Sequence, residues 1–120
     1  PPAGMSGRME RFDFGPGGGY RMTLTYADPA GAPGKTTADS DTVELRFVEI
    51  VPDRRLVLAA VFEADDPAFA GEMTMTWELA PAAGGTMVTV TADNVPAGIS
   101  AADHEAGLNS SLENLARFVE

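Results

Sequence analysis

The C-terminal stretch ISAADHEAGLNSSLENLARFVE, residues 99–120, decides the fold because it carries the signals of one long amphipathic helix. Ser100 can accept hydrogen bonds from the free amides of the first turn. Asp103, three residues later, adds a reciprocal bond and a negative charge at the positive end of the helix dipole. We therefore predict a helix over residues 100–119. At about 100° per residue, its apolar side chains form one narrow stripe that should face the sheet: Leu108, Leu112, Leu115 and Val119.

Six short runs with the pattern of β-strands precede this helix. The clearest covers residues 20–26, where tyrosine, methionine and leucine alternate with arginine and threonine. Glycine or proline breaks at 15–19 and at Pro52–Asp53 separate neighbouring runs and predict hairpin turns. The polar segment 27–42 predicts a long loop. The predicted strands cover residues 6–14, 20–26, 43–51, 54–62, 72–80 and 86–93.

The order of these elements indicates the fold class. Strands follow one another without intervening helices, which favours an antiparallel sheet over a parallel, doubly wound one. The single helix comes last and needs a sheet face to cover its apolar stripe. We therefore predict one α+β domain over residues 1–120, in which an antiparallel sheet packs against the C-terminal helix.

Composition and charge narrow the class of partner. The chain has 120 residues, of which 44% are hydrophobic and 22% charged, as in an ordinary globular domain. A net charge of −10 would repel a nucleic-acid backbone or an anionic bilayer, so we expect neither as a partner. No apolar run reaches the roughly 18 residues that a membrane-spanning helix needs. Because cysteine is absent, we expect no disulfide and a cytoplasmic location.

The inward faces of the predicted strands mix aromatic rings with methionine. A flexible thioether fills irregular space, so such faces fit an adaptable apolar pocket, while each residue alone also fits ordinary core packing. We predict that a small apolar molecule binds between the sheet and the helix. The candidate contacts on the strands are Tyr20, Met22, Phe47, Met75 and Trp77.

Polar candidates for the same site come from the helix and from one strand. His104, the only histidine, lies at the edge of the helix stripe together with Leu108 and Ser111, which we also include among the ligand contacts. A histidine there can anchor a ligand, and a core histidine satisfied by a hydrogen bond is the alternative. Glu49 shares the predicted inward face of Phe47, where a carboxylate would need a partner, and a water-exposed position is the alternative.

No pattern in the sequence fits a catalytic, metal or cofactor site. One histidine and no cysteine exclude the usual zinc sites, and the acidic pairs at 39/41 and 65/66 lack the glycine and distal glutamate of a calcium loop. The segment GPGGGY, residues 15–20, fits neither a phosphate-binding loop nor a dinucleotide fingerprint. We expect no catalytic residue, metal or cofactor, and binding is favoured over catalysis.

Five segments together resemble a known family: FDFGPGGGYRM (12–22), FVEIVPDRRLV (47–57), GEMTMTWEL (71–79), GGTMVTV (84–90) and DHEAGLNSSLENLARFVE (103–120). They are similar to the bacterial branch of the family named for activators of the heat-shock protein 90 ATPase, within the START-like (SRPBCC) superfamily. The resemblance covers nearly the whole chain. The closing helix is its most specific part, through Asp103, His104, Gly107, Ser111, Leu112 and Leu115.

This resemblance implies the helix-grip fold, a strongly curved antiparallel sheet wrapped around the long C-terminal helix. Relatives begin with a strand and short helices before the position of Pro1, which implies that the START-like domain of residues 1–120 lacks these elements at its N-terminus. A second chain, as in a homodimer, could then complete the open sheet edge.

For function, the resemblance implies the binding of a lipid-like or aromatic molecule in the cavity. A protein-interaction module with a chaperone partner and an enzyme of the cyclase or hydrolase-like type are the alternatives.

Overall fold

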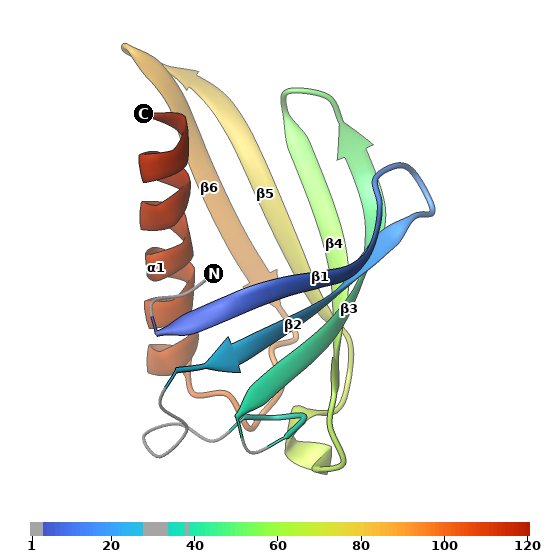
Figure 1. Cartoon of the computed structure of the whole chain (residues 1–120). Coiled ribbons are helices and arrows are strands. Elements are labelled where there is room, and N and C mark those ends of the chain that lie inside the picture. Colours follow the sequence, from blue (N-terminus) through green and yellow to red (C-terminus); the bar gives the residue numbers. More distant parts are fainter. Residues whose placement is uncertain (1–3, 28–33, 38) are drawn as a thin grey trace.

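The computed structural model describes residues 4–27, 34–37 and 39–120 of the chain. These residues form six strands, one short 3₁₀ helix and one α-helix (Figure 1). The strands build one antiparallel sheet in which spatial order equals chain order, from β1 to β6. The elements are β1 (Met5–Asp13), β2 (Gly19–Tyr26), β3 (Ser40–Val51), β4 (Arg55–Glu63), η1 (Pro67–Phe69), β5 (Met73–Ala82), β6 (Gly85–Asp93) and α1 (Ala101–Val119).

The sheet is strongly curved, and α1 runs along β6 on the concave side (Figure 1). The predicted α+β class, antiparallel sheet and helix-grip architecture are therefore confirmed. The helix begins where the sequence predicts, because Ser100 Oγ accepts a hydrogen bond from the Asp103 amide at 3.1 Å. Glu113 and Arg117 form an ion pair at 3.9 Å on the exposed side of the helix.

The third strand begins earlier than predicted. β3 starts at Ser40, whereas the sequence pattern placed residues 40–42 at the end of a polar loop. Ser40, Asp41 and Thr42 are buried although they are polar, because each has hydrogen-bond partners. The predicted loop over 27–42 is thus too long at its C-terminal end, and its positions 28–33 and 38 lie outside the described residues.

The core lies on the concave face of β3, β4 and β5. Phe47 is its aromatic centre, only 3% exposed, and the rings of Phe12, Phe14 and Tyr20 surround it at centroid distances of 5.1–6.2 Å. The buried core consists of Val43, Leu45, Phe47, Leu58, Ala60 and Met73.

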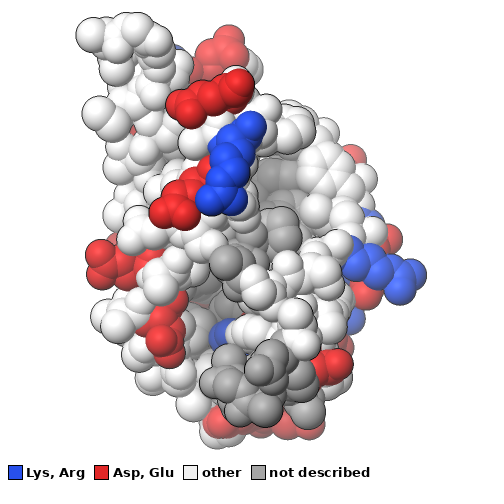
Figure 2. All heavy atoms as spheres, turned by 60° about the vertical axis from the view of Figure 1, so that its left-hand side comes forward, with Lys and Arg blue, Asp and Glu red and all other residues white. Residues whose placement is uncertain are grey.

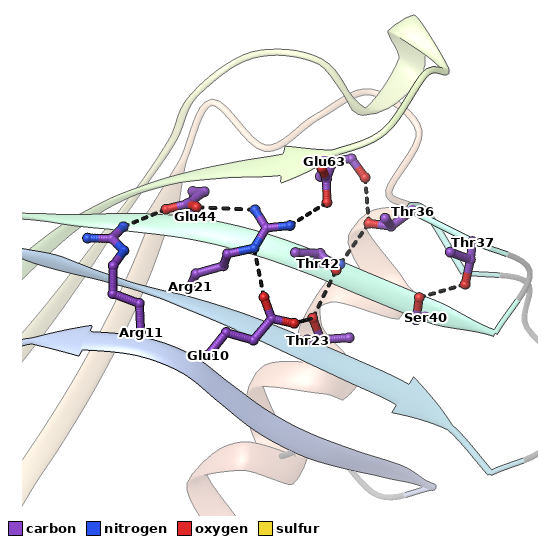
Figure 3. Close-up of polar contacts among 10 residues, drawn as sticks. All are labelled: Glu10, Arg11, Arg21, Thr23, Thr36, Thr37, Ser40, Thr42, Glu44 and Glu63. Atoms are coloured by element: carbon purple, nitrogen blue, oxygen red, sulfur yellow. Dashed lines mark hydrogen bonds and ion pairs between the residues drawn. The ribbon is translucent and has the colours of Figure 1, made fainter.

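The convex face carries polar contacts that tie the first four strands together (Figure 3). Arg21 on β2 reaches Glu10 on β1 at 2.8 Å, Glu44 on β3 at 3.2 Å and Glu63 on β4 at 2.8 Å. Hydrogen bonds from Thr23 and from Arg21 lower the pKa of Glu10. This network engages the outward side chains of Arg21 and Thr23, while the alternate residues of β2 point to the concave face.

Replacing Phe47 with alanine tests whether the core centres on β3. We expect Phe47→Ala to lower the free energy of unfolding by about 3–5 kcal/mol, because it empties a buried aromatic site. The matched change Phe12→Ala removes a ring that is 57% exposed and should cost far less. Urea denaturation of both variants measures the difference, and similar losses would contradict this description of the core.

Candidate functional site

The concave face of the sheet is only partly covered by α1. No residue of the helix is buried, although the sheet-facing Leu108 and Leu112 are half-buried. On the sheet, Met22, Met75 and Trp77 pack against the core but stay partly exposed. Figure 2, which views the molecule from the side of the helix, shows a hollow in this surface. A groove therefore runs between the helix and the sheet.

One end of this groove is a mostly apolar pocket of about 260 Å³. It lies between the β3–β4 turn, the middle of β5 and β6, and the C-terminal half of α1. Leu115 contributes the helix side and Trp77 the sheet side. The lining residues are Phe14, Ile50, Val51, Pro52, Asp53, Arg54, Arg55, Leu56, Trp77, Leu79, Val88 and Leu115.

The other end of the groove holds a buried ion pair. Lys35 Nζ lies 2.9 Å from Asp41 Oδ2, and the two side chains are only 15% and 5% exposed. The Lys35 amide donates to Asp41 Oδ1 at 2.6 Å, and the Tyr26 hydroxyl donates to Asp41 Oδ2 at 3.2 Å. Asp41 pairs with Leu24 across the strands and precedes the core residue Val43 by two positions, so its side chain points to the concave face.

Neighbouring groups fix the position of Lys35. The Thr36 hydroxyl donates to the carbonyl oxygen of Glu63 and accepts a hydrogen bond from the Thr42 amide, which fastens this segment to β3 and β4 (Figure 3). The ammonium group of Lys35 lies 5.0 Å from the ring centroid of Phe62 and 5.7 Å from that of Phe69. Aromatic faces attract a cation, so the lysine is held on several sides.

His104 lies in the first turn of α1, near Lys35. Its imidazole is half-buried and makes no hydrogen bond with any residue that the structure describes. Burial and, after it, the positive charge of Lys35 lower the pKa of His104, so the ring is neutral near pH 7. Burial, the negative charge and hydrogen bond of Asp41, and the charge of Asp103 raise the pKa of Tyr26. These effects place the first turn of α1 close to Lys35, Asp41 and Tyr26.

Eight of the nine predicted contacts lie on the concave face of the sheet or on the helix, and Trp77 is the one among them that lines the apolar pocket. Five of them lie on the concave face, and of these only Phe47 belongs to the buried core: Tyr20, Met22, Phe47, Met75 and Trp77. His104, Leu108 and Ser111 lie half-buried on the helix. Their role in binding a ligand remains a prediction.

The predicted inward position of Glu49 is wrong. A β-bulge between Phe47 and Glu49 shifts the register, so that Glu49 pairs with Val57, whose neighbours Leu56 and Leu58 point to the concave face. Glu49 therefore points to the convex side, where it is exposed and lies 3.9 Å from Arg55. Glu49 and His104 therefore lie on opposite sides of the sheet.

Sequence reasoning identified Trp77 at one end of the groove and His104 at the other, but it missed other residues at both ends. Lys35 and Asp41 lie in a segment that looks like a polar loop, and nothing in its composition shows that they are buried. Leu115 was predicted on the apolar stripe of the helix. Its position in a pocket could not be predicted, because it depends on the distance between the helix and the sheet. The alternation of Tyr20 to Tyr26 was a usable signal for Tyr26, since it puts the Tyr26 ring on the inward face.

A second groove, of about 270 Å³, lies on the convex face beside the glycine-rich turn. Its arginines are already paired, Arg11 with Glu44 at 2.7 Å and Arg46 with Glu72 at 3.4 Å. The concave groove combines a larger apolar surface with polar groups at one end, and is therefore the better candidate site.

Within the described residues, no group of three histidine, cysteine, aspartate or glutamate side chains could hold a metal ion. Across the same residues, no helix has the length and apolar character needed to cross a membrane.

The depressed pKa of His104 predicts a pH effect on stability. In the unfolded chain the imidazole titrates near 6.5, whereas the folded protein takes up that proton only at lower pH. The free energy of unfolding should therefore fall as the pH drops below about 6.5. This loss should end once the pH is below the pKa of His104 in the folded protein. Chemical denaturation near pH 7.5 and pH 5.5 should show a larger loss for the wild type than for His104→Asn. An equal loss in both proteins would contradict this assignment.

Comparisons with known proteins agree with this architecture. The family described as activator of Hsp90 ATPase homolog 1-like protein matches residues 5–120. A crystal structure of a protein from Chromobacterium violaceum is similar, with a TM-score of 0.85 and 27% sequence identity, and the match covers 100% of this chain and 76% of that one. None of the curated proteins matches the chain. Because the family match spans nearly all of the sequence, the chain belongs to the activator of Hsp90 ATPase homolog 1-like family.

Proposed function

We propose that this protein binds a small, largely apolar molecule in the groove between α1 and the concave face of the sheet. The observation that carries the proposal is the partial exposure of apolar side chains on both walls of the groove. A close-packed core would bury them, because apolar surface left in water costs about 25 cal/mol per Å². Met75 and Trp77 on the sheet and Leu108 and Leu112 on the helix stay accessible instead.

The pocket beside Trp77 and Leu115 supplies the space for such a molecule. Its volume of about 260 Å³ approaches that of small ligand sites in proteins, which begin near 300 Å³. The hollow between helix and sheet extends the available room (Figure 2). Binding would bury apolar surface of the ligand and of both walls together, which is the main driving force for association.

The alternative of an acid–base enzyme receives no support from the geometry. Glu49, the carboxylate among the predicted contacts, lies on the opposite face of the sheet from His104. The polar groups near His104, which are Lys35, Asp41 and Tyr26, form a compensated ion pair and its hydrogen bonds. These polar groups can orient a bound molecule, and we propose that orientation is their role.

Native mass spectrometry of the purified protein tests the proposal. We expect a species heavier than the bare chain, whose extra mass is lost on denaturation, because an apolar molecule in the groove dissociates slowly into water. If the protein is isolated empty, we expect it to take up the neutral probe 1-N-phenylnaphthylamine. A protein that is empty and also fails to bind this probe would contradict the proposal.

A charge placed inside the pocket should weaken probe binding. Leu115→Glu puts a carboxylate on the lining, and an ionised group in an apolar site is costly, so we expect at least about a tenfold loss of affinity for 1-N-phenylnaphthylamine. Phe118→Glu is the matched control on the same helix, since Phe118 is 88% exposed and outside the pocket lining. Energy transfer from Trp77, the single tryptophan, to the probe measures both affinities. Equal affinities for the two variants would place the probe elsewhere.

A further inference from the structure

The polar end of the groove has a distinctive charge balance. Lys35 is a nearly buried cation, but Asp41 neutralises it at 2.9 Å. Within the described residues, the charges that act on His104 and Tyr26 are those of Lys35, Asp41 and Asp103, which amount to one positive and two negative groups. An incoming carboxylate or phosphate would find no uncompensated cation here, and would be repelled by the charges already present.

Hydrogen-bonding capacity, in contrast, is available. The His104 imidazole makes no hydrogen bond with a described residue, and its neutral ring offers one donor and one acceptor. The Tyr26 hydroxyl donates to Asp41, so its oxygen can still accept a hydrogen bond. An uncharged group that both donates and accepts, such as a hydroxyl, matches these two partners.

Resting on the proposed function, we infer that the natural ligand is an amphipathic molecule with an uncharged, hydrogen-bonding head group. The head contacts His104 and Tyr26 beside the Lys35–Asp41 ion pair, and the apolar tail extends along α1 toward Trp77 and Leu115. Eleven residues separate His104 from Leu115, which corresponds to about 16 Å along the helix axis. The ligand class is therefore an extended alcohol, ketone or amide, and fatty acids and phosphorylated lipids should bind more weakly than these uncharged molecules.

Two probes with the same tail separate these head groups. Competition with bound 1-N-phenylnaphthylamine measures the affinity of 1-dodecanol and of dodecanoate near pH 8, where the acid is ionised. We expect the alcohol to bind at least about ten times more tightly than the carboxylate. Tighter binding of dodecanoate would overturn the inference.

An apolar groove alone would also prefer the alcohol, so variants must show that the polar end is responsible. Asp41→Asn keeps the size of the side chain but leaves the charge of Lys35 uncompensated, so dodecanoate should bind about tenfold more tightly than to the wild type, while the alcohol changes little. Asp93→Asn makes the same change in net charge at an exposed position of β6 and should leave both affinities as they are. An unchanged carboxylate affinity in Asp41→Asn would overturn the inference.

Asp41 is buried, so its variant could fail to fold. Asp103→Asn, at an exposed position in the first turn of α1, removes one of the two negative charges near Tyr26 and should shift the preference in the same direction by a smaller factor. Tyr26→Phe should weaken the alcohol and leave 1-N-phenylnaphthylamine unaffected. If Asp103→Asn does not shift the preference and Tyr26→Phe does not weaken the binding of the alcohol, the assigned head-group site is refuted. If 1-N-phenylnaphthylamine itself fails to bind the wild type, the proposed function fails before the head-group preference is reached.

Discussion

The strong curvature of an antiparallel sheet that is covered by a single helix is the constraint on which the rest of this structure depends. The concave face exposes apolar side chains from β2 to β6, and α1 is too narrow to cover them all. The helix therefore stands over a groove rather than a sealed core, with none of its residues buried. Among the described residues, the buried cluster of apolar side chains lies on β3, β4 and β5, which hold the sheet together beneath that groove.

The two ends of the groove differ in chemistry because different parts of the chain build them. The apolar end comes from hairpin turns and from the end of the helix, where Trp77 and Leu115 face each other across the pocket. The polar end comes from Lys35, in the segment before β3, and from the start of β3, where Asp41 accepts hydrogen bonds from Lys35 and Tyr26. A buried ion pair costs desolvation that its hydrogen bonds must offset, and in the proposed function this pair orients the bound molecule.

Periodicity predicted the elements of this fold well, because amphipathic strands and helices show their buried side directly in the sequence. The cap at Ser100 and the inward alternation on β2 were both read correctly. Two features were not predicted correctly: the orientation of Glu49 and the burial of the Lys35–Asp41 pair. The bulge after Phe47 reverses the side chain of Glu49, and a bulge is a register effect that no local pattern reveals. The buried pair Lys35–Asp41 was missed because polar residues become core residues only through distant partners.

Methyl NMR of the methionine side chains tests most directly whether a ligand enters between helix and sheet. Met22 and Met75 lie on the concave face, whereas Met87 is 58% exposed on β6. Titration with 1-N-phenylnaphthylamine should shift the methyl resonances of Met22 and Met75, give contacts between probe and these methyls, and leave Met87 unchanged. Shifts at Met87 alone, with Met22 and Met75 unaffected, would place the probe on the outer surface and contradict the account of an open binding groove.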